Sequence, residues 1–159
     1  MLPGRWKFFR VMCLFQMAFA GLAAGYALIF LFLTGSLFRF LDVICFTAIL
    51  LFANLGLSLI NYNYPDVTPQ GRQKKYFNIL FLINFFLLSF IGAHVFNERW
   101  SLFVVMEYNF GLWGSTVILL ELIAYILIFV LQVYLLYNMF RLRRELYSNF
   151  MRSIEEIAS

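Results

Sequence analysis

The residues best suited to chemistry lie on one face of a long apolar run near the C-terminus. Glu121 is followed by Tyr125, Ile128 and Gln132, at intervals of four, three and four residues. Residues with this spacing lie on one side of an α-helix, so the carboxyl, phenol and amide groups would share a face. Such a face could take up and pass on a proton or another ion, with Glu121 as the group that changes charge.

A structural role is the alternative for Glu121. Burial in lipid disfavours the charged form of a carboxyl group, so this side chain could be neutral and bonded to Asn54 or Asn84, or to a neighbouring subunit. The same apolar run contains no Lys, Arg or second carboxylate that could act as a relay partner. We therefore favour the structural role over proton transfer.

The elements that would position these groups are membrane-spanning helices. The chain has 159 residues, of which 64% are hydrophobic and 13% are charged. Soluble domains have roughly 45–50% apolar and about 25% charged residues. The composition therefore predicts an all-α integral membrane protein with one domain, residues 1–159. Its four apolar runs cover about 11–33, 43–60, 76–96 and 112–140, close to the length of about 20 residues that a spanning helix needs.

The first apolar run follows a basic N-terminus and could resemble a signal peptide. It continues for 13 residues beyond Ala20, which is longer than a signal peptide requires, so we expect it to be retained as a span. Within it, Gly21 and Gly25 are four residues apart and share a helix face. Small residues with this spacing allow two helices to approach closely. We expect them to pack within the chain, with a homodimer face as the alternative.

The second run carries a polar stripe formed by Thr47, Asn54, Ser58 and Asn61. Intervals of seven, four and three residues place these side chains on one side of a helix. Polar side chains in lipid bond to neighbouring helices, so we expect the stripe to face the bundle interior. A polar pore lining is the alternative.

The distribution of positive charge predicts the topology. Ten of the twelve Lys and Arg residues lie in the N-terminal flank, the 61–75 loop or the 141–159 tail, whereas only Arg39 and Arg99 lie in the other two connections. Positive residues are enriched in cytoplasmic flanks, so both termini should be cytoplasmic, most simply at a cell or inner membrane. The tail repeats apolar residues every three or four positions from Leu142 to Ile157, which predicts an amphipathic helix.

Catalytic and metal-binding patterns are missing from the sequence. Cys13 and Cys45 lie inside apolar runs without metal-ligand or disulfide spacing, so we expect no cofactor or metal site. Residues 98–111 are amphiphilic and too short to span, which favours an interfacial segment. Among the groups near that segment, a lipid- or quinone-modifying enzyme could use His94, Glu98, Arg99 and Glu107, but a single histidine and the lack of enzyme motifs argue against catalysis.

These observations favour a non-enzymatic multi-pass membrane protein. We expect it to act as a small subunit or as an accessory or assembly component of a larger membrane complex. The alternative is an oligomeric channel or transporter subunit, linked to ions or protons through Glu121. The expected partners are membrane lipids and other membrane-protein subunits or further copies of the chain, and nucleic acid is not expected.

Overall fold

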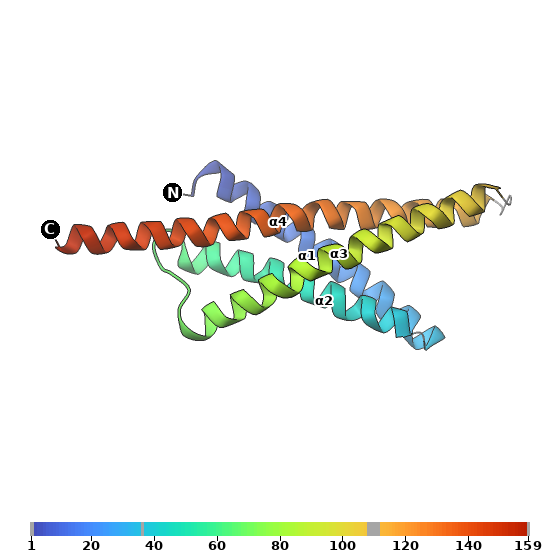
Figure 1. Ribbon diagram of the computed structural model, residues 1–159, viewed down its shortest axis with the longest axis horizontal. Coiled ribbons are helices and arrows are strands. Elements are labelled where there is room, and N and C mark those ends of the chain that lie inside the picture. The colour runs from blue at the N-terminus through green and yellow to red at the C-terminus, as the bar shows by residue number, and fades with distance from the viewer. Residues whose placement is uncertain (1, 36, 108–111, 159) are drawn as a thin grey trace.

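The computed structural model of the chain is an all-α bundle of four long helices (Figure 1). These are α1 (Gly4–Thr34), α2 (Leu37–Ser58), α3 (Gly71–Glu107) and α4 (Leu112–Ala158). The structure describes residues 2–35, 37–107 and 112–158. Within these ranges it describes the side chains other than those at positions 34, 38, 94–107, 112–115, 117, 118, 121 and 158.

The structure has four helical segments long and apolar enough to cross a membrane. These segments are Gly4–Leu33, Arg39–Asn63, Gly71–Ala93 and Leu122–Ile157, and the second continues from α2 into the short π-helix that follows it. Large apolar side chains also cover much of the outer surface; Leu22 of α1 is 74% exposed and Phe32 is 81% exposed. Such a surface is stable in contact with lipid and unfavourable in contact with water. The predicted all-α architecture with four candidate spans is therefore confirmed, and it indicates a multi-pass membrane protein.

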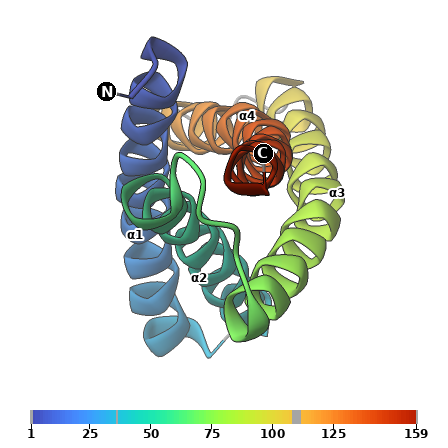
Figure 2. The ribbon, with the colours of Figure 1, turned by 90° about the vertical axis from the view of Figure 1, so that its left-hand side faces the viewer.

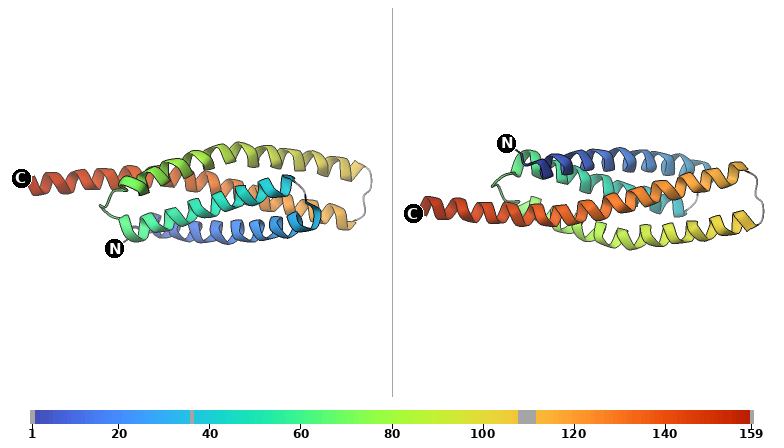
Figure 3. Two further views of the ribbon diagram at one scale, coloured as in Figure 1. Left: turned by 90° about the horizontal axis from the view of Figure 1, so that it is seen from below. Right: turned by 90° about the horizontal axis from the view of Figure 1, so that it is seen from above.

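The bundle consists of two helical hairpins, because α1 packs mainly against α2 and α3 mainly against α4. The view along the bundle in Figure 2 shows α4 beside both α1 and α3. In Figure 3, the start of α1, the loop between α2 and α3, and the end of α4 all lie at the same end of the molecule. We refer to it below as the terminal end of the bundle.

Local backbone features set the limits of the helices. Gly35 ends α1 with a positive φ of 61°, and its N–H bonds to the carbonyl of Leu31. This left-handed conformation is readily available to glycine and commonly ends helices. After α2, the chain forms a π-helical turn, Leu59–Asn63, and then the loop that leads to α3.

The third helix is longer than its sequence suggested. We predicted that the span would end near residue 96 and that residues 98–111 would form a separate interfacial segment. Instead, α3 continues as one helix to Glu107. No proline or glycine lies between Gly92 and Glu107, so nothing in this stretch forces the helix to end.

The core is divided into two clusters along the bundle. The cluster nearer the terminal end includes Trp6, Phe9, Phe52 and Met139, and the other is formed around Phe46, Ile49, Ile91 and Tyr125. Residues from at least three helices meet in each cluster. The apolar core therefore joins the two hairpins to each other as well as closing each hairpin.

Gly56 allows α1, α2 and α4 to approach closely within the first cluster. A Cβ atom added there would lie 3.0 Å from Cys13 Sγ, 3.2 Å from Phe9 Cζ and 3.3 Å from Met139 Sδ. The predicted packing glycines have more space. A Cβ atom on Gly21 would lie 3.7 Å from Leu50, and one on Gly25 would meet no atom within 4 Å among the described residues.

Candidate functional site

Three buried amide side chains connect the helices at the centre of the bundle. Gln16 of α1, Asn84 of α3 and Gln132 of α4 are each 0% exposed. Gln16 Nε2 donates to Gln132 Oε1 at 3.1 Å, and Gln132 Nε2 donates to Asn84 Oδ1 at 2.7 Å. The three amides therefore form a continuous hydrogen-bonded chain, which we call the amide cluster.

The amide cluster also bonds to the backbone of the surrounding helices. Asn84 Nδ2 donates to the carbonyls of Leu80, at 2.8 Å, and Ala48, at 3.3 Å. Gln16 Nε2 lies 3.4 Å from the carbonyl of Ile128. The cluster thus involves all four helices, and Gln16 Oε1 is its buried atom without a hydrogen-bond partner among the described residues.

Amide side chains can perform only one of the two roles considered for this intramembrane face, which are hydrogen bonding between helices and proton transfer. They donate and accept hydrogen bonds, but they do not gain or lose a proton near neutral pH. The amide cluster is therefore suited to holding helices together by polar contacts in lipid. Proton uptake would need a titratable group, and at this face that group would be Glu121.

The structure brings together only some of the residues predicted to form the intramembrane site. Asn84 and Gln132 are in direct contact, and Tyr125 is buried on the same face of α4 as Gln132, with its ring 6.0 Å from that of Phe46. The backbone of Glu121 lies in α4, but its side chain is outside the described residues. Its pairing with Asn54 or Asn84 therefore stays a prediction.

Asn54 lies away from this cluster, on the outer face of α2. Its side chain is exposed, as are those of Thr47 and Asn61, while Ser58 is half-buried. The prediction that this stripe faces the bundle interior was therefore wrong. The physical reason is steric, because the opposite face of α2 carries Gly56 and the large apolar side chains that fill the core.

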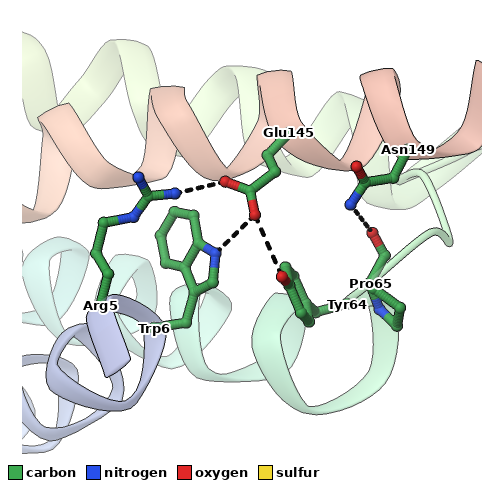
Figure 4. Close-up of polar contacts among 6 residues, drawn as sticks. All are labelled: Arg5, Trp6, Tyr64, Pro65, Glu145 and Asn149. Atoms are coloured by element: carbon green, nitrogen blue, oxygen red, sulfur yellow. Dashed lines mark hydrogen bonds and ion pairs between the residues drawn. The ribbon is translucent and has the colours of Figure 1, made fainter. Parts of the chain in front are cut away.

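A second polar cluster lies at the terminal end and is centred on Glu145 of α4 (Figure 4). Arg5 donates to Glu145 Oε2 at 2.5 Å, while Trp6 Nε1 and the Tyr64 hydroxyl donate to Oε1 at 2.9 and 3.2 Å. The Arg5 guanidinium also lies 4.3 Å from the centre of the Trp6 ring. One carboxylate thereby joins the start of α1, the loop after α2 and the later part of α4. We call the group formed by Arg5, Trp6, Tyr64 and Glu145 the Glu145 clamp.

Neighbouring contacts reinforce this end of the bundle. Asn149 donates to the carbonyl of Pro65 at 2.9 Å, one turn of α4 beyond Glu145 (Figure 4). Asn63 and Gln73 exchange two amide hydrogen bonds of 2.9 and 3.3 Å across the loop. Burial, together with the adjacent Glu145 carboxylate, raises the pKa of the Tyr64 phenol above its ordinary value. Tyr64 is therefore a neutral donor at physiological pH.

Sequence reasoning missed two central residues of these clusters. Gln16 is the only amide residue in the first apolar run, and that isolation was the available signal. Glu145 follows Arg141, Arg143 and Arg144 in the tail, for which the sequence predicts an amphipathic helix without a role for this carboxylate. An acidic residue directly after a basic group is a weak signal, because it does not identify a distant partner such as Arg5.

The structure does not describe the side chains of the four residues that were considered for a lipid- or quinone-modifying enzyme. His94, Glu98, Arg99 and Glu107 lie on the backbone of α3, and their side chains are outside the described residues. Among the residues that were described, no group of three or more metal-binding side chains occurs. Comparisons with protein families, with curated proteins and with solved structures found no match for this chain.

Proposed function

We propose that this chain is a non-enzymatic membrane protein that works by association, as a small subunit or an accessory or assembly component of a larger membrane complex. The observation that carries this proposal is the outward position of Asn54. Its amide lies on the surface of α2, about three residues from the middle of the apolar segment Arg39–Asn63. It would therefore lie deep in the hydrocarbon region.

An exposed amide at that depth favours a protein neighbour. Moving an amide from water to hydrocarbon without a partner costs roughly 4–8 kcal/mol, whereas a hydrogen bond between helices recovers about 0.6–2 kcal/mol of interaction. No described residue of the chain bonds to the Asn54 side chain. Thr47, on the same face, already bonds to the carbonyl of Val43 in its own helix. Asn54 is thus the polar group best placed to bond to another subunit.

The inner polar groups are less suited to transport. Gln16, Asn84 and Gln132 bond to one another, so they are engaged in holding helices together. A channel or transporter based on Glu121 would require a path of polar groups that can exchange partners. The amide cluster instead supports a fixed bundle whose outer surface makes the functional contacts.

The proposed orientation places the terminal end of the bundle in the cytoplasm, following the distribution of Lys and Arg. The end of α4 would then form a cytoplasmic amphipathic extension. Leu142 and Leu146 of this segment are buried against the bundle, whereas Met151, Ile154 and Ile157 are exposed. These exposed apolar residues provide a second surface for a membrane or a protein partner.

Site-specific photo-cross-linking tests the proposal. A photoreactive amino acid replaces Asn54 in one variant and Leu82 in a control, since Leu82 is also exposed, on α3. We expect covalent protein adducts in native membranes from position 54 and few from position 82. The adduct mass distinguishes a second copy from a different subunit.

A matched pair of substitutions provides a second test of the proposed function. Asn54→Leu should abolish association and leave the bundle as stable as the wild type, because Asn54 is exposed. Asn84→Leu should lower the unfolding temperature, because Asn84 bonds inside the bundle. A monomer in native membranes, without adducts at either position, would contradict the proposed function.

A further inference from the structure

A cationic cavity lies at the terminal end of the bundle, between the loop after α2, the first turns of α3 and one face of α4. Its volume is about 520 Å³, and its lining includes Lys74, Arg143 and Arg144. Phe77, Phe140 and Tyr147 form its aromatic walls. Cavities of this size are common for small-molecule ligands. The cavity combines three positive charges with an apolar wall.

The positive charges of the cavity are not neutralised within the described part of the chain. No carboxylate lines the cavity among the residues that the structure describes. The ion pairs in the described residues join Arg5 to Glu145 and Arg39 to Asp42, so neither involves a cation of the cavity. Three cations that converge without a counter-ion form a site of strong positive potential.

Arg143 is held in place before any ligand binds. Its Nη1 donates to Asn78 Oδ1 at 2.7 Å, and its guanidinium lies 5.2 Å from the centre of the Phe77 ring. These contacts fix the direction of the side chain, so less conformational entropy is lost on binding. Lys74 and Arg144 are exposed and can move toward a ligand.

The depth of the cavity matches the level of lipid headgroups. Lys74 lies in the first turn of the apolar segment Gly71–Ala93, and Phe140 is the last residue of the long apolar run in α4. The aromatic walls therefore lie next to the hydrocarbon region, and the cations lie next to water. An amphiphile with a negative head and an apolar body has the same order of groups.

We propose that this cavity binds the headgroup of an anionic phospholipid. Lys74, Arg143 and Arg144 bind the phosphate, and the exposed rings of Phe140 and Tyr147 contact the glycerol and the first carbons of the acyl chains. Guanidinium groups bind phosphate oxygens with charge-assisted hydrogen bonds. The sequence alone favours topogenic charge over a phosphate or lipid-headgroup site for Arg72, Lys74 and Lys75, because three basic residues are fewer than such a site usually has. The two arginines that α4 adds are distant in sequence.

Lipid binding by the purified full-length chain tests this proposal. Native mass spectrometry in a neutral detergent measures the binding of dioleoyl-phosphatidylglycerol and of dioleoyl-phosphatidylcholine. These lipids have the same acyl chains and differ in net charge. We expect one tightly bound phosphatidylglycerol per chain and weaker binding of phosphatidylcholine.

Two double variants with equal loss of charge show whether the cavity is the site. Lys74→Gln with Arg144→Gln should weaken phosphatidylglycerol binding about 30-fold, because each cation near a lipid surface contributes a roughly fivefold effect. Arg72→Gln with Lys75→Gln should change it less than twofold, because those residues do not line the cavity. Arg143 is kept because it also contacts Asn78. Unfolding midpoints equal to that of the wild type would show that both variants are folded.

Two results would overturn the proposal. Equal weakening in both double variants would mean that a diffuse basic surface attracts the lipid. Displacement of phosphatidylglycerol by millimolar inorganic phosphate would assign the cavity to a soluble anion instead of a lipid. Neither result bears on cross-linking at position 54, so this inference and the proposed function can fail separately.

Discussion

Gln132 is the residue of the amide cluster with a side-chain partner on either side. It accepts from Gln16 and donates to Asn84. A leucine at this position would leave both neighbours buried without their shared partner. A buried donor or acceptor that loses its partner typically costs about 1–3 kcal/mol.

The first prediction concerns this residue. Gln132→Leu should lower the free energy of unfolding by about 1–3 kcal/mol. Equilibrium unfolding in mixed detergent micelles measures the difference. Val133→Leu is the control, because Val133 is exposed on α4 and its replacement adds only apolar surface. If Gln132→Leu were as stable as the control, the amide cluster would not hold the bundle together.

Individual residues of the site were only partly predictable. Asn84 and Gln132 are recognisable in the sequence as polar groups in apolar runs, but their contact depends on the order of helices around the bundle. Helical periodicity describes the faces of one helix and does not show which helices meet. The role of Glu145 is harder to predict than those of the two amides, because its partners Arg5 and Tyr64 come from distant parts of the chain.

At the scale of single elements, α2 depends on the missing side chain of Gly56. Three side-chain atoms from α1 and α4 lie within 3.3 Å of the position that a Cβ atom would occupy there. An added methyl group would have to displace the packed side chains of Phe9, Cys13 and Met139. Overpacking of this kind costs about 1–3 kcal/mol.

Alanine substitutions provide the second prediction. Gly56→Ala should lower the free energy of unfolding by about 1–3 kcal/mol, although alanine favours a helix more than glycine does. Gly21→Ala and Gly25→Ala should be neutral or stabilising, because a Cβ atom has room at both positions. Unfolding midpoints of the three variants measure the difference. A stabilising Gly56→Ala would show that α2 does not lie as close to its neighbours.

The outward stripe of α2 shows why faces are less predictable than spans. A span is recognised from composition, and each of the four predicted runs lies in a long helix of the structure. Which face is buried depends on shape as well as polarity. Phe46, Phe52 and Gly56 fit the neighbouring helices, and that fit turns Thr47, Asn54 and Asn61 outward.

At the scale of the whole molecule, the positions of the loops and helix ends predict which parts of the chain face the same side of the membrane. The loop after α2 and the later part of α4 lie at the terminal end, and the start of α2 lies at the opposite end (Figure 3). With four spans in one membrane, these two ends would face opposite compartments. The distribution of Lys and Arg then favours a cytoplasmic terminal end.

Cysteine labelling provides the third prediction. Asp66→Cys and Ser148→Cys should react with an impermeant maleimide only in inside-out vesicles, whereas Leu37→Cys should react only in right-side-out vesicles. The native Cys13 and Cys45 are buried, so the unsubstituted protein serves as the unlabelled control. Labelling of positions 66 and 148 from opposite sides would contradict the four-span arrangement.

The long final helix has a mechanical consequence. With 47 residues, α4 is about 70 Å long, more than twice the thickness of a hydrocarbon core. The helix contains no proline, and the Glu145 clamp fastens it to α1 and to the loop after α2. Asn149 adds one more contact with the loop, through the carbonyl of Pro65. The last fixed point of α4 therefore lies at Asn149, and the residues from Phe150 to Ala158 extend about 14 Å beyond it as a lever arm. A change in the tilt of α4 within the membrane would swing that arm, so a subunit bound to its tip would sense the tilt as a displacement.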